Sequence, residues 1–305
     1  MNILVTGVTG YVGAAVVPAL LRDGHVVRGF ARDPTRVALQ IPTVKGDAVS
    51  GDGLEQALDG IDVAYYLIHS MEPTATNGPF AGVEQLAAQR FADASVRASV
   101  GRIVYLGGIL PASGARSAHL ASRVQVEQIL LARVPDSVAL RASIVIGARS
   151  RAFRFLVRLV ERLPVLAIPA WRDNRTQPID ERDVIEFLVR AATAGAVGGR
   201  SLDVGGPDVV TYGQLIDRIR EAMLVARPTF TLRGLTVTPI ASRIAAMIAG
   251  EQHELIGPLM ESLNTDLLLR DNDAVDLLAV KLHRLDAAID NALRTWEASE
   301  PLTAR

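Results

Sequence analysis

Three glycines near the start of the chain have the spacing of a phosphate-binding loop. Gly7, Gly10 and Gly13 follow the apolar segment 3–6 and open a helical pattern at 12–22. The first glycine permits a tight turn, the second lets the backbone approach a diphosphate, and the third allows close packing of helix and strand. A glycine-rich turn without a ligand is the alternative. The predicted contacts to a dinucleotide in this loop are Gly7, Thr9, Gly10, Tyr11, Val12 and Gly13.

A second group of residues lies where the adenosine ribose is usually bound, about 20 residues beyond such glycines. Here the sequence is Arg32-Asp33-Pro34. An acidic residue would bind the ribose hydroxyls of NAD, and an arginine would bind the 2′-phosphate of NADP. Asp33 before Pro34 is also a typical helix cap followed by a first-turn proline. That role leaves Arg32 for the phosphate, so we expect NADP(H) rather than NAD(H), unless Arg32 is only a solvated loop residue.

Residues after the third and fourth expected strands complete the predicted cofactor site. Asp47 and Ala48 follow a short strand at Val44. Asp47 could accept a hydrogen bond from the adenine amino group or simply form a turn. Leu67 lies near the end of an expected strand at 61–68 and His69 directly follows it, and ligands in this type of sheet bind at the carboxyl ends of strands. We therefore expect both near the nicotinamide ribose, with a strand-capping His69 as the alternative.

The elements that position these residues alternate short β-branched segments with helical patterns. This alternation predicts βα units and a parallel sheet covered by helices on both faces. The expected fold is a doubly wound α/β Rossmann sheet of about seven strands with a smaller, mostly helical C-terminal lobe. The expected strands span residues 3–6, 25–30, 61–68, 102–106, 138–145 and 201–205, with the short one at Val44, and the long helices span 80–99 and 118–132.

The pattern changes beyond Gly147, which indicates a division of the chain. We predict that residues 1–147 and 176–206 form the dinucleotide-binding domain. Residues 148–175 and 207–305 are then the substrate-binding C-terminal lobe. Within the lobe, Thr211 and Gln214 predict a capping box for a helix at 212–224. Short strands are expected at 230–237 and 266–270. Trp171 is expected in a surface loop, with the edge of the substrate cleft as the alternative.

Composition excludes several classes of function. Lys plus Arg total 32 and Asp plus Glu total 33, so the net charge of −1 argues against a nucleic-acid partner. The chain has no cysteine, which excludes disulfides and metal–thiolate sites. We expect no membrane span, because the most apolar stretch, 235–249, is shorter than the about 20 residues that a span requires. A cytoplasmic location is the resulting expectation.

Together these segments resemble the short-chain dehydrogenase/reductase superfamily. The similarity is greatest to its extended and atypical branches, which include the NmrA-like and YbjT-like NAD(P)H-binding proteins. The segments that carry the resemblance are 6–13, 32–34, 46–47, 103–106, 140–142, 177–184 and 204–207. The resemblance implies that the cofactor lies at the carboxyl edge of the sheet and that a substrate cleft lies under the C-terminal lobe. It also implies a homodimer that forms through helices 80–99 and 118–132.

The residues expected to do chemistry depart from the family pattern. Catalytic relatives carry Tyr-x-x-x-Lys at the start of the second long helix, where this chain has His119 and Arg123. Their serine or threonine after the fifth strand is replaced by Gly107-Gly108. Histidine can donate and accept protons near neutral pH, and arginine could hold the nicotinamide ribose. Alternatively, Arg123 forms only a surface pair with Glu127, and His119 has no chemical role.

Two functions follow from these observations. The first is an NADPH-dependent oxidoreductase for a small, fairly apolar carbonyl or quinone substrate, with His119 and Arg123 at its active site. The second is a non-catalytic NADP(H)-binding sensor or scaffold protein of the NmrA-like type, which keeps the glycine loop without the acid–base groups. The usual serine and Tyr-x-x-x-Lys are missing in both cases.

Overall fold

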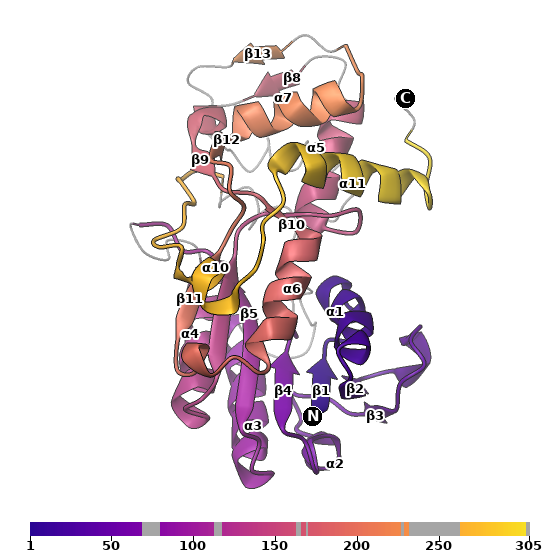
Figure 1. Cartoon of the computed structure of the whole chain (residues 1–305), viewed down its shortest axis with the longest axis vertical. Coiled ribbons are helices and arrows are strands. Elements are labelled where there is room, and N and C mark those ends of the chain that lie inside the picture. Colours follow the sequence, from indigo (N-terminus) through magenta and orange to yellow (C-terminus); the bar gives the residue numbers. More distant parts are fainter. Residues whose placement is uncertain are drawn as a thin grey trace.

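A parallel sheet of seven strands forms the centre of the larger part of the molecule (Figure 1). The computed structural model describes residues 1–68, 80–112, 118–162, 166–168, 170–226, 229–231 and 263–302. The strand order is β11-β6-β5-β4-β1-β2-β3, and all neighbouring pairs are parallel. The strands are β1 (Asn2–Thr6), β2 (Val26–Ala31), β3 (Thr43–Lys45), β4 (Val63–Tyr66), β5 (Arg102–Gly108), β6 (Val138–Ala142) and β11 (Ser201–Val204). The predicted Rossmann fold is confirmed, and the strand order reverses between β1 and β4, where such sheets bind ligands.

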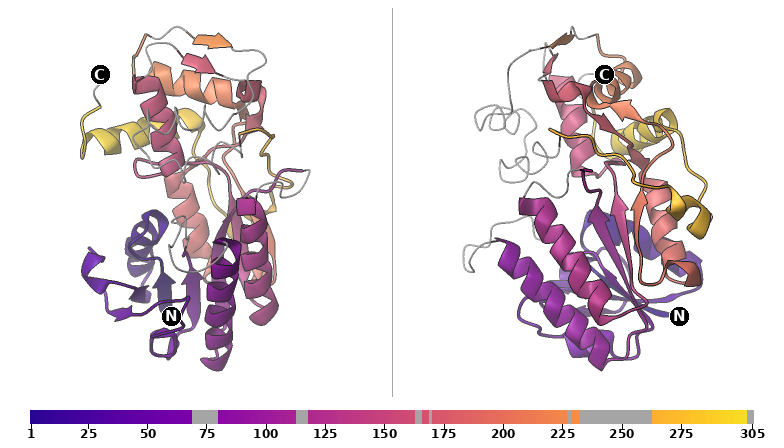
Figure 2. Two further views of the ribbon diagram at one scale, coloured as in Figure 1. Left: turned by 180° about the vertical axis from the view of Figure 1, so that it is seen from behind. Right: turned by 90° about the vertical axis from the view of Figure 1, so that its left-hand side faces the viewer.

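Helices cover both faces of this sheet, as its apolar strands require. One face packs against α1 (Tyr11–Arg22), α6 (Glu181–Ala191) and α10 (Asp273–Leu278). The other face packs against α2 (Leu54–Leu58), α3 (Phe80–Arg97) and α4 (Ala118–Arg133). Along β4, Tyr65 belongs to the first core and Tyr66 to the second, because successive side chains of a strand point to opposite faces. In Figure 2, α3 and α4 run side by side along their face of the sheet.

A third hydrophobic core lies beyond the sheet, in the upper part of Figure 1. It is formed mainly by α5 (Arg151–Arg162), α7 (Tyr212–Ala222) and α11 (Leu285–Glu297). The predicted capping box begins α7, since Thr211 Oγ1 accepts from Gln214 N at 3.1 Å and Gln214 Oε1 accepts from Thr211 N at 2.8 Å. Trp171 is only 5% exposed in the short turn η2 (Ala170–Asp173), so the expectation of a surface loop is wrong for this residue.

Several short strands connect the sheet to this third core. The expected strand at 138–145 is interrupted, because β6 ends at Ala142 and β7 (Val145–Ile146) pairs with β10 (Ile179–Asp180) instead. β9 (Arg175–Thr176) pairs with β12 (Val210–Thr211), and β8 (Leu166–Ile168) with β13 (Thr229–Thr231). The expected strand at 266–270 is reduced to one bridge between Leu267 and Thr176. Residues 232–237 of the other expected strand lie outside the described residues.

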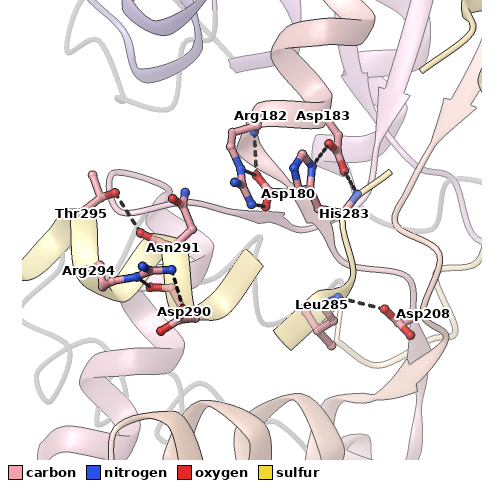
Figure 3. A network of polar contacts seen from close by, with 10 residues as sticks. All are labelled: Asp180, Arg182, Asp183, Asp208, His283, Leu285, Asp290, Asn291, Arg294 and Thr295. Atoms are coloured by element: carbon pink, nitrogen blue, oxygen red, sulfur yellow. Dashed lines mark hydrogen bonds and ion pairs between the residues drawn. The ribbon is translucent and has the colours of Figure 1, made fainter. Parts of the chain in front are cut away.

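Polar contacts fasten the C-terminal segment to both parts of the molecule (Figure 3). His283 Nδ1 lies 2.5 Å from Asp183 Oδ1 on α6, and His283 N donates to Asp183 Oδ2 at 2.8 Å. Asp208 Oδ2 accepts from Leu285 N at 2.8 Å, which satisfies one of the open amide groups at the start of α11. The C-terminal segment therefore contributes α10 to the first core, on the α1 and α6 face of the sheet, and α11 to the third core.

Candidate functional site

The turn between β1 and α1 has the geometry that the glycine spacing predicts. Gly7 has a φ of +64°, and a Cβ there would lie 2.4 Å from the carbonyl oxygen of Leu67. A Cβ on Gly13 would lie 2.3 Å from the carbonyl oxygen of Gly7. Any side chain at either position would collide with fixed backbone. Gly10 N donates to Gly7 O at 2.8 Å, which closes the turn.

The start of α1 is open toward the carboxyl edge of the sheet. Its cap is Gly10, which supplies no side chain to the first amide groups of the helix, and these groups have no partner within the helix. Thr9 and Gly10 are exposed, whereas Val8 is buried. Thr6 Oγ1 donates to Tyr65 O at 2.9 Å and accepts from Leu67 N at 3.1 Å, which fixes the ends of β1 and β4. Backbone N–H groups without a helical partner, the positive end of the helix dipole and a glycine at the cap together suit a diphosphate.

Tyr11 connects this loop to the start of α6. A Cβ on Gly147 would lie 2.0 Å from the Tyr11 hydroxyl and 2.2 Å from Glu181 Oε2, so both side chains occupy the space beside Gly147. Burial raises the pKa of the Tyr11 hydroxyl, and the charge of Glu181 adds to this effect. Burial also raises the pKa of the Glu181 carboxyl group. Sequence reasoning missed Glu181 and the packing role of Gly147, and the only signal was the change of pattern at Gly147.

The end of β2 presents the residues expected at the adenosine ribose. Asp33 Oδ1 accepts from Thr35 N at 3.0 Å and from Thr35 Oγ1 at 2.6 Å, and Asp33 caps the short helix η1 (Pro34–Arg36). These two hydrogen bonds lower the pKa of Asp33. Arg32 is exposed and makes no hydrogen bond or ion pair within the described part of the chain. The capping role expected for Asp33 is confirmed, and a charged donor remains available beside it.

The turn after β3 is tightly built. Asp47 Oδ1 accepts from Val49 N at 2.7 Å, so this side chain forms the turn that sequence reasoning gave as one alternative. Ala48 is 4% exposed. A Cβ on Gly46 would lie 2.2 Å from the carbonyl oxygen of Asp52, which requires glycine directly after β3. The second carboxylate oxygen of Asp47 retains capacity for a further donor.

The start of α4 carries the residues at the usual catalytic positions. His119 belongs to the first turn of α4, but its side chain lies outside the described residues, and so does His69. Arg123 is 8% exposed and lines a small cavity with Glu84 and Tyr105. Burial raises the pKa of Tyr105 to about 12, against the opposing positive charge of Arg123. The Tyr105 hydroxyl also donates to Arg123 O at 3.4 Å.

The expected surface pair of Arg123 and Glu127 is not formed. Glu127 is 4% exposed, and it accepts hydrogen bonds from Arg141 Nε at 2.8 Å and from Ser201 Oγ at 2.5 Å. Glu84 is buried as well and accepts from Ser122 Oγ at 2.5 Å. A signal for Glu84 and Glu127 exists in the sequence, because each continues the apolar stripe of its helix at i, i+3 and i+4 spacing.

Other types of site receive no support from the described residues. In these ranges no group of three or more histidine, aspartate or glutamate side chains is arranged to hold a metal ion. Among the helices in the same ranges, none combines the length and apolar character needed to cross a bilayer.

Comparison with known proteins agrees with the nucleotide site. Residues 7–142 match a family described as NAD(P)H-binding. A 3-beta-hydroxysteroid dehydrogenase of Mycolicibacterium neoaurum is 41% identical over 67 residues, which are 21% of this chain and 18% of that protein. A ceramide reductase of Caulobacter vibrioides is 26% identical over 200 residues, covering 64% of this chain and 62% of that protein. The alignments therefore span less than two thirds of either relative.

Solved structures resemble the whole fold. The UDP-glucose 4-epimerase of Thermotoga maritima in complex with UDP-glucose superposes with a TM-score of 0.75. The alignment covers 98% of this chain and 99% of that chain at 13% sequence identity. An identity this low establishes a common fold without a common substrate.

Proposed function

We propose that this chain is an NADPH-dependent oxidoreductase with an unusual active site. The proposal starts from its fit to the extended and atypical short-chain dehydrogenase/reductases. The observation that carries the proposal is the glycine loop. Gly7 and Gly13 admit no side chain, and the uncapped start of α1 faces the carboxyl edge beside the β1/β4 switch point. This arrangement fits the diphosphate of a dinucleotide.

The chemistry follows from where the chain would hold this cofactor. A bound nicotinamide would supply or accept the hydride. Arg123 would hold the nicotinamide ribose from α4, because it occupies the position of the family's lysine. His119, one helical turn earlier, or a bound water would move the proton between the substrate oxygen and solvent. His69 and Leu67, after β4, would border the same ribose.

We propose an apolar substrate with a carbonyl or hydroxyl group. The two curated relatives bear names that refer to a hydroxysteroid and to ceramide, and both names describe lipids that carry such groups. The apolar character of the C-terminal third of this chain agrees with a lipid-like substrate or a quinone. NADPH oxidation in the presence of sterol ketones, keto-sphingolipids and quinones is the direct measurement. The variant His119→Ala should then lower kcat far more than cofactor affinity, and an unchanged kcat would remove His119 from the mechanism.

The preference for NADP(H) rests on the two residues after β2. Because Thr35 engages Asp33, Arg32 is the residue left to bind a 2′-phosphate. Arg32→Ala should weaken NADPH binding by about 1–3 kcal/mol, since a charged group loses its partner, and should leave NADH binding almost unchanged. Titration calorimetry with both nucleotides measures this difference. Equal losses for the two nucleotides would contradict the assignment.

A second candidate function is a cofactor-binding sensor without turnover. Gly107 and Gly108 leave the end of β5 without the usual hydroxyl group, and His119 and Arg123 replace the usual tyrosine and lysine. This candidate predicts tight dinucleotide binding with no turnover on the whole substrate panel, whereas measurable turnover would eliminate it. For either function we also propose a homodimer that forms through α3 and α4.

A further inference from the structure

A small cavity lies between the sheet and the helices α3 and α4. Its volume is about 10 Å³, which is close to the minimum needed for one water molecule. Residues with polar side chains line it from four elements: Tyr66 from β4, Tyr105 from β5, Glu84 from α3 and Arg123 from α4. A cavity of this size with several polar partners fits one ordered water, whereas apolar cavities stay dry.

The hydrogen-bond inventory of these side chains is incomplete without such a water. Tyr66 is 2% exposed, yet its hydroxyl makes no hydrogen bond to the described part of the chain. Glu84 is 5% exposed and receives one hydrogen bond, from Ser122, although a carboxylate can accept about four. A hydroxyl without a partner inside the protein loses the hydrogen bonds that it makes to water in the unfolded chain. One water could accept from Tyr66, donate to Glu84 and so satisfy both groups.

The same cavity touches the residue assigned to the nicotinamide ribose. Arg123 borders it from the start of α4, one residue after Ser122. Glu84 and Arg123 carry opposite charges, and both act on the Tyr66 hydroxyl: Glu84 adds to the rise in its pKa that burial causes, and Arg123 opposes it. The buried carboxylate and the guanidinium therefore lie within electrostatic reach of each other in a region that excludes bulk water.

We infer that this cavity holds one ordered water between Tyr66, Glu84 and Arg123, and that Glu84 is thereby a positioning residue for Arg123. A guanidinium that is anchored on its inner side loses less conformational freedom when its outer N–H groups bind a ribose. The inference rests on the proposed function, in which Arg123 contacts the nicotinamide ribose. Ser122 contributes by fixing the Glu84 carboxyl group through the hydrogen bond described above.

The chain offers a matched control on the same strand. Tyr65 is as deeply buried as Tyr66, but its hydroxyl lies on the opposite face of the sheet and donates to Leu188 O at 2.8 Å. Tyr65→Phe therefore removes a buried hydroxyl without touching the cavity. Glu84→Gln keeps the shape of the side chain and an oxygen that can accept from Ser122, so it removes the charge with little change in packing.

The experiment measures binding of two probes, NADPH and 2′,5′-ADP, which lacks the nicotinamide ribose. Glu84→Gln should weaken NADPH binding about tenfold, corresponding to one charge-assisted hydrogen bond, and leave 2′,5′-ADP binding unchanged. Tyr66→Phe should act in the same direction by about threefold. Tyr65→Phe should change neither probe. A high-resolution crystal structure of the ligand-free protein should show the water, and that of Tyr66→Phe should show it displaced or absent.

Each contrary result has a separate meaning. If Glu84→Gln binds both probes like the wild type, or loses affinity for both equally, Glu84 does not position Arg123 and the inference is overturned. A wild-type crystal structure without a water in this cavity overturns the inference that the cavity is hydrated. If the wild type binds neither probe, the proposed function fails and the positioning role fails with it, while the crystal still decides whether the water is present.

Discussion

At the scale of single residues, the candidate site depends on glycines at positions where a side chain would collide with its surroundings. Gly7 and Gly13 are required because backbone atoms occupy the space of a Cβ, whereas at Gly147 the Tyr11 and Glu181 side chains occupy that space. Gly147 lies more than a hundred positions from Gly13 in the chain, yet its contact with Tyr11 joins the segment after β6 to the glycine loop. A side chain at Gly147 would therefore displace the Tyr11 and Glu181 side chains, and Tyr11 is the first residue of α1.

The variant Gly13→Ala tests this steric requirement. Its Cβ would approach Gly7 O to 2.3 Å, so the turn and α1 must separate. We expect a loss of about 1–3 kcal/mol in the free energy of unfolding, as for other overpacked sites, together with loss of dinucleotide binding. Urea denaturation and calorimetry measure the two effects.

Gly82 supplies the control for this prediction. It lies in α3, and no described atom comes within 4 Å of a Cβ built there. Gly82→Ala should raise the free energy of unfolding by about 0.5–1 kcal/mol, because alanine favours the helix and restricts the unfolded chain. If Gly13→Ala were as stable as Gly82→Ala and still bound the nucleotide, the glycine loop would not be the tight turn described here.

At the scale of elements, the start of α6 makes stability depend on pH. The pKa of Glu181 is raised above 4.5 by burial, so the folded state favours the protonated carboxyl group. Its contribution to stability is present below the unfolded pKa and is lost as pH rises through the raised pKa. Wild type should therefore lose stability relative to Glu181→Gln as pH rises from acid toward neutral, through the raised pKa of Glu181. Urea denaturation of both proteins across this range measures the difference, and a constant difference would contradict the burial argument.

The contact between Asp266 and β9 predicts the opposite slope. Asp266 accepts hydrogen bonds from Arg175 N at 2.7 Å and from the Arg175 guanidinium at 2.7 and 3.0 Å. These bonds lower the pKa of Asp266 from 3.8, so its contribution to stability is present above that value and is lost as pH falls through the lowered pKa. Asp266→Asn should be less stable than wild type near neutral pH and approach it in acid. A difference in the free energy of unfolding between wild type and Asp266→Asn that grows as pH falls would refute this prediction.

The elements also show what the sequence could predict. The parallel sheet, the two long helices and the capping box of α7 follow from local patterns of apolar spacing and capping residues. The break between β6 and β7 does not, because it depends on the pairing of β7 with β10, which is distant in sequence. For the same reason residues 266–270 form a single bridge instead of a strand: a β-branched or apolar segment pairs only where a partner edge is available.

The candidate site divides in the same way. The glycine loop is predictable because its spacing encodes a backbone conformation, and the cap at Asp33 is predictable because both partners are adjacent in sequence. The carboxyl groups of Glu84 and Glu181 were not identified. Their environments arise from helices and loops that meet only in the folded molecule, and a polar residue in an apolar stripe is a weak signal by itself. The division of the chain at residues 147, 176 and 206 stays a prediction.

At the scale of the whole molecule, the proposed dimer would use the outer surface of α3 and α4. The two helices form a groove of about 390 Å³ lined by Gln85, Gln89, Gln125 and Gln128, and the Gln85 and Gln125 side chains hydrogen-bond to each other. Val96, also on α3, is 51% exposed. A twofold dimer uses the same surface on both copies, so glutamines on one copy would meet donors and acceptors of the same kind on the other.

This surface gives the prediction that concerns assembly. Changing Gln89 and Gln128 together to Glu would place four like charges in the interface of a twofold dimer, two from each copy, and like charges at an interface cost several kcal/mol. The double variant should be monomeric at concentrations where wild type is dimeric, as measured by light scattering after size exclusion, with dinucleotide affinity unchanged. Gln40→Glu with Gln56→Glu adds the same charge at exposed positions outside α3 and α4 and should leave the dimer intact. A monomeric wild type, or a double variant that dimerises like wild type, would show that this face is not the interface.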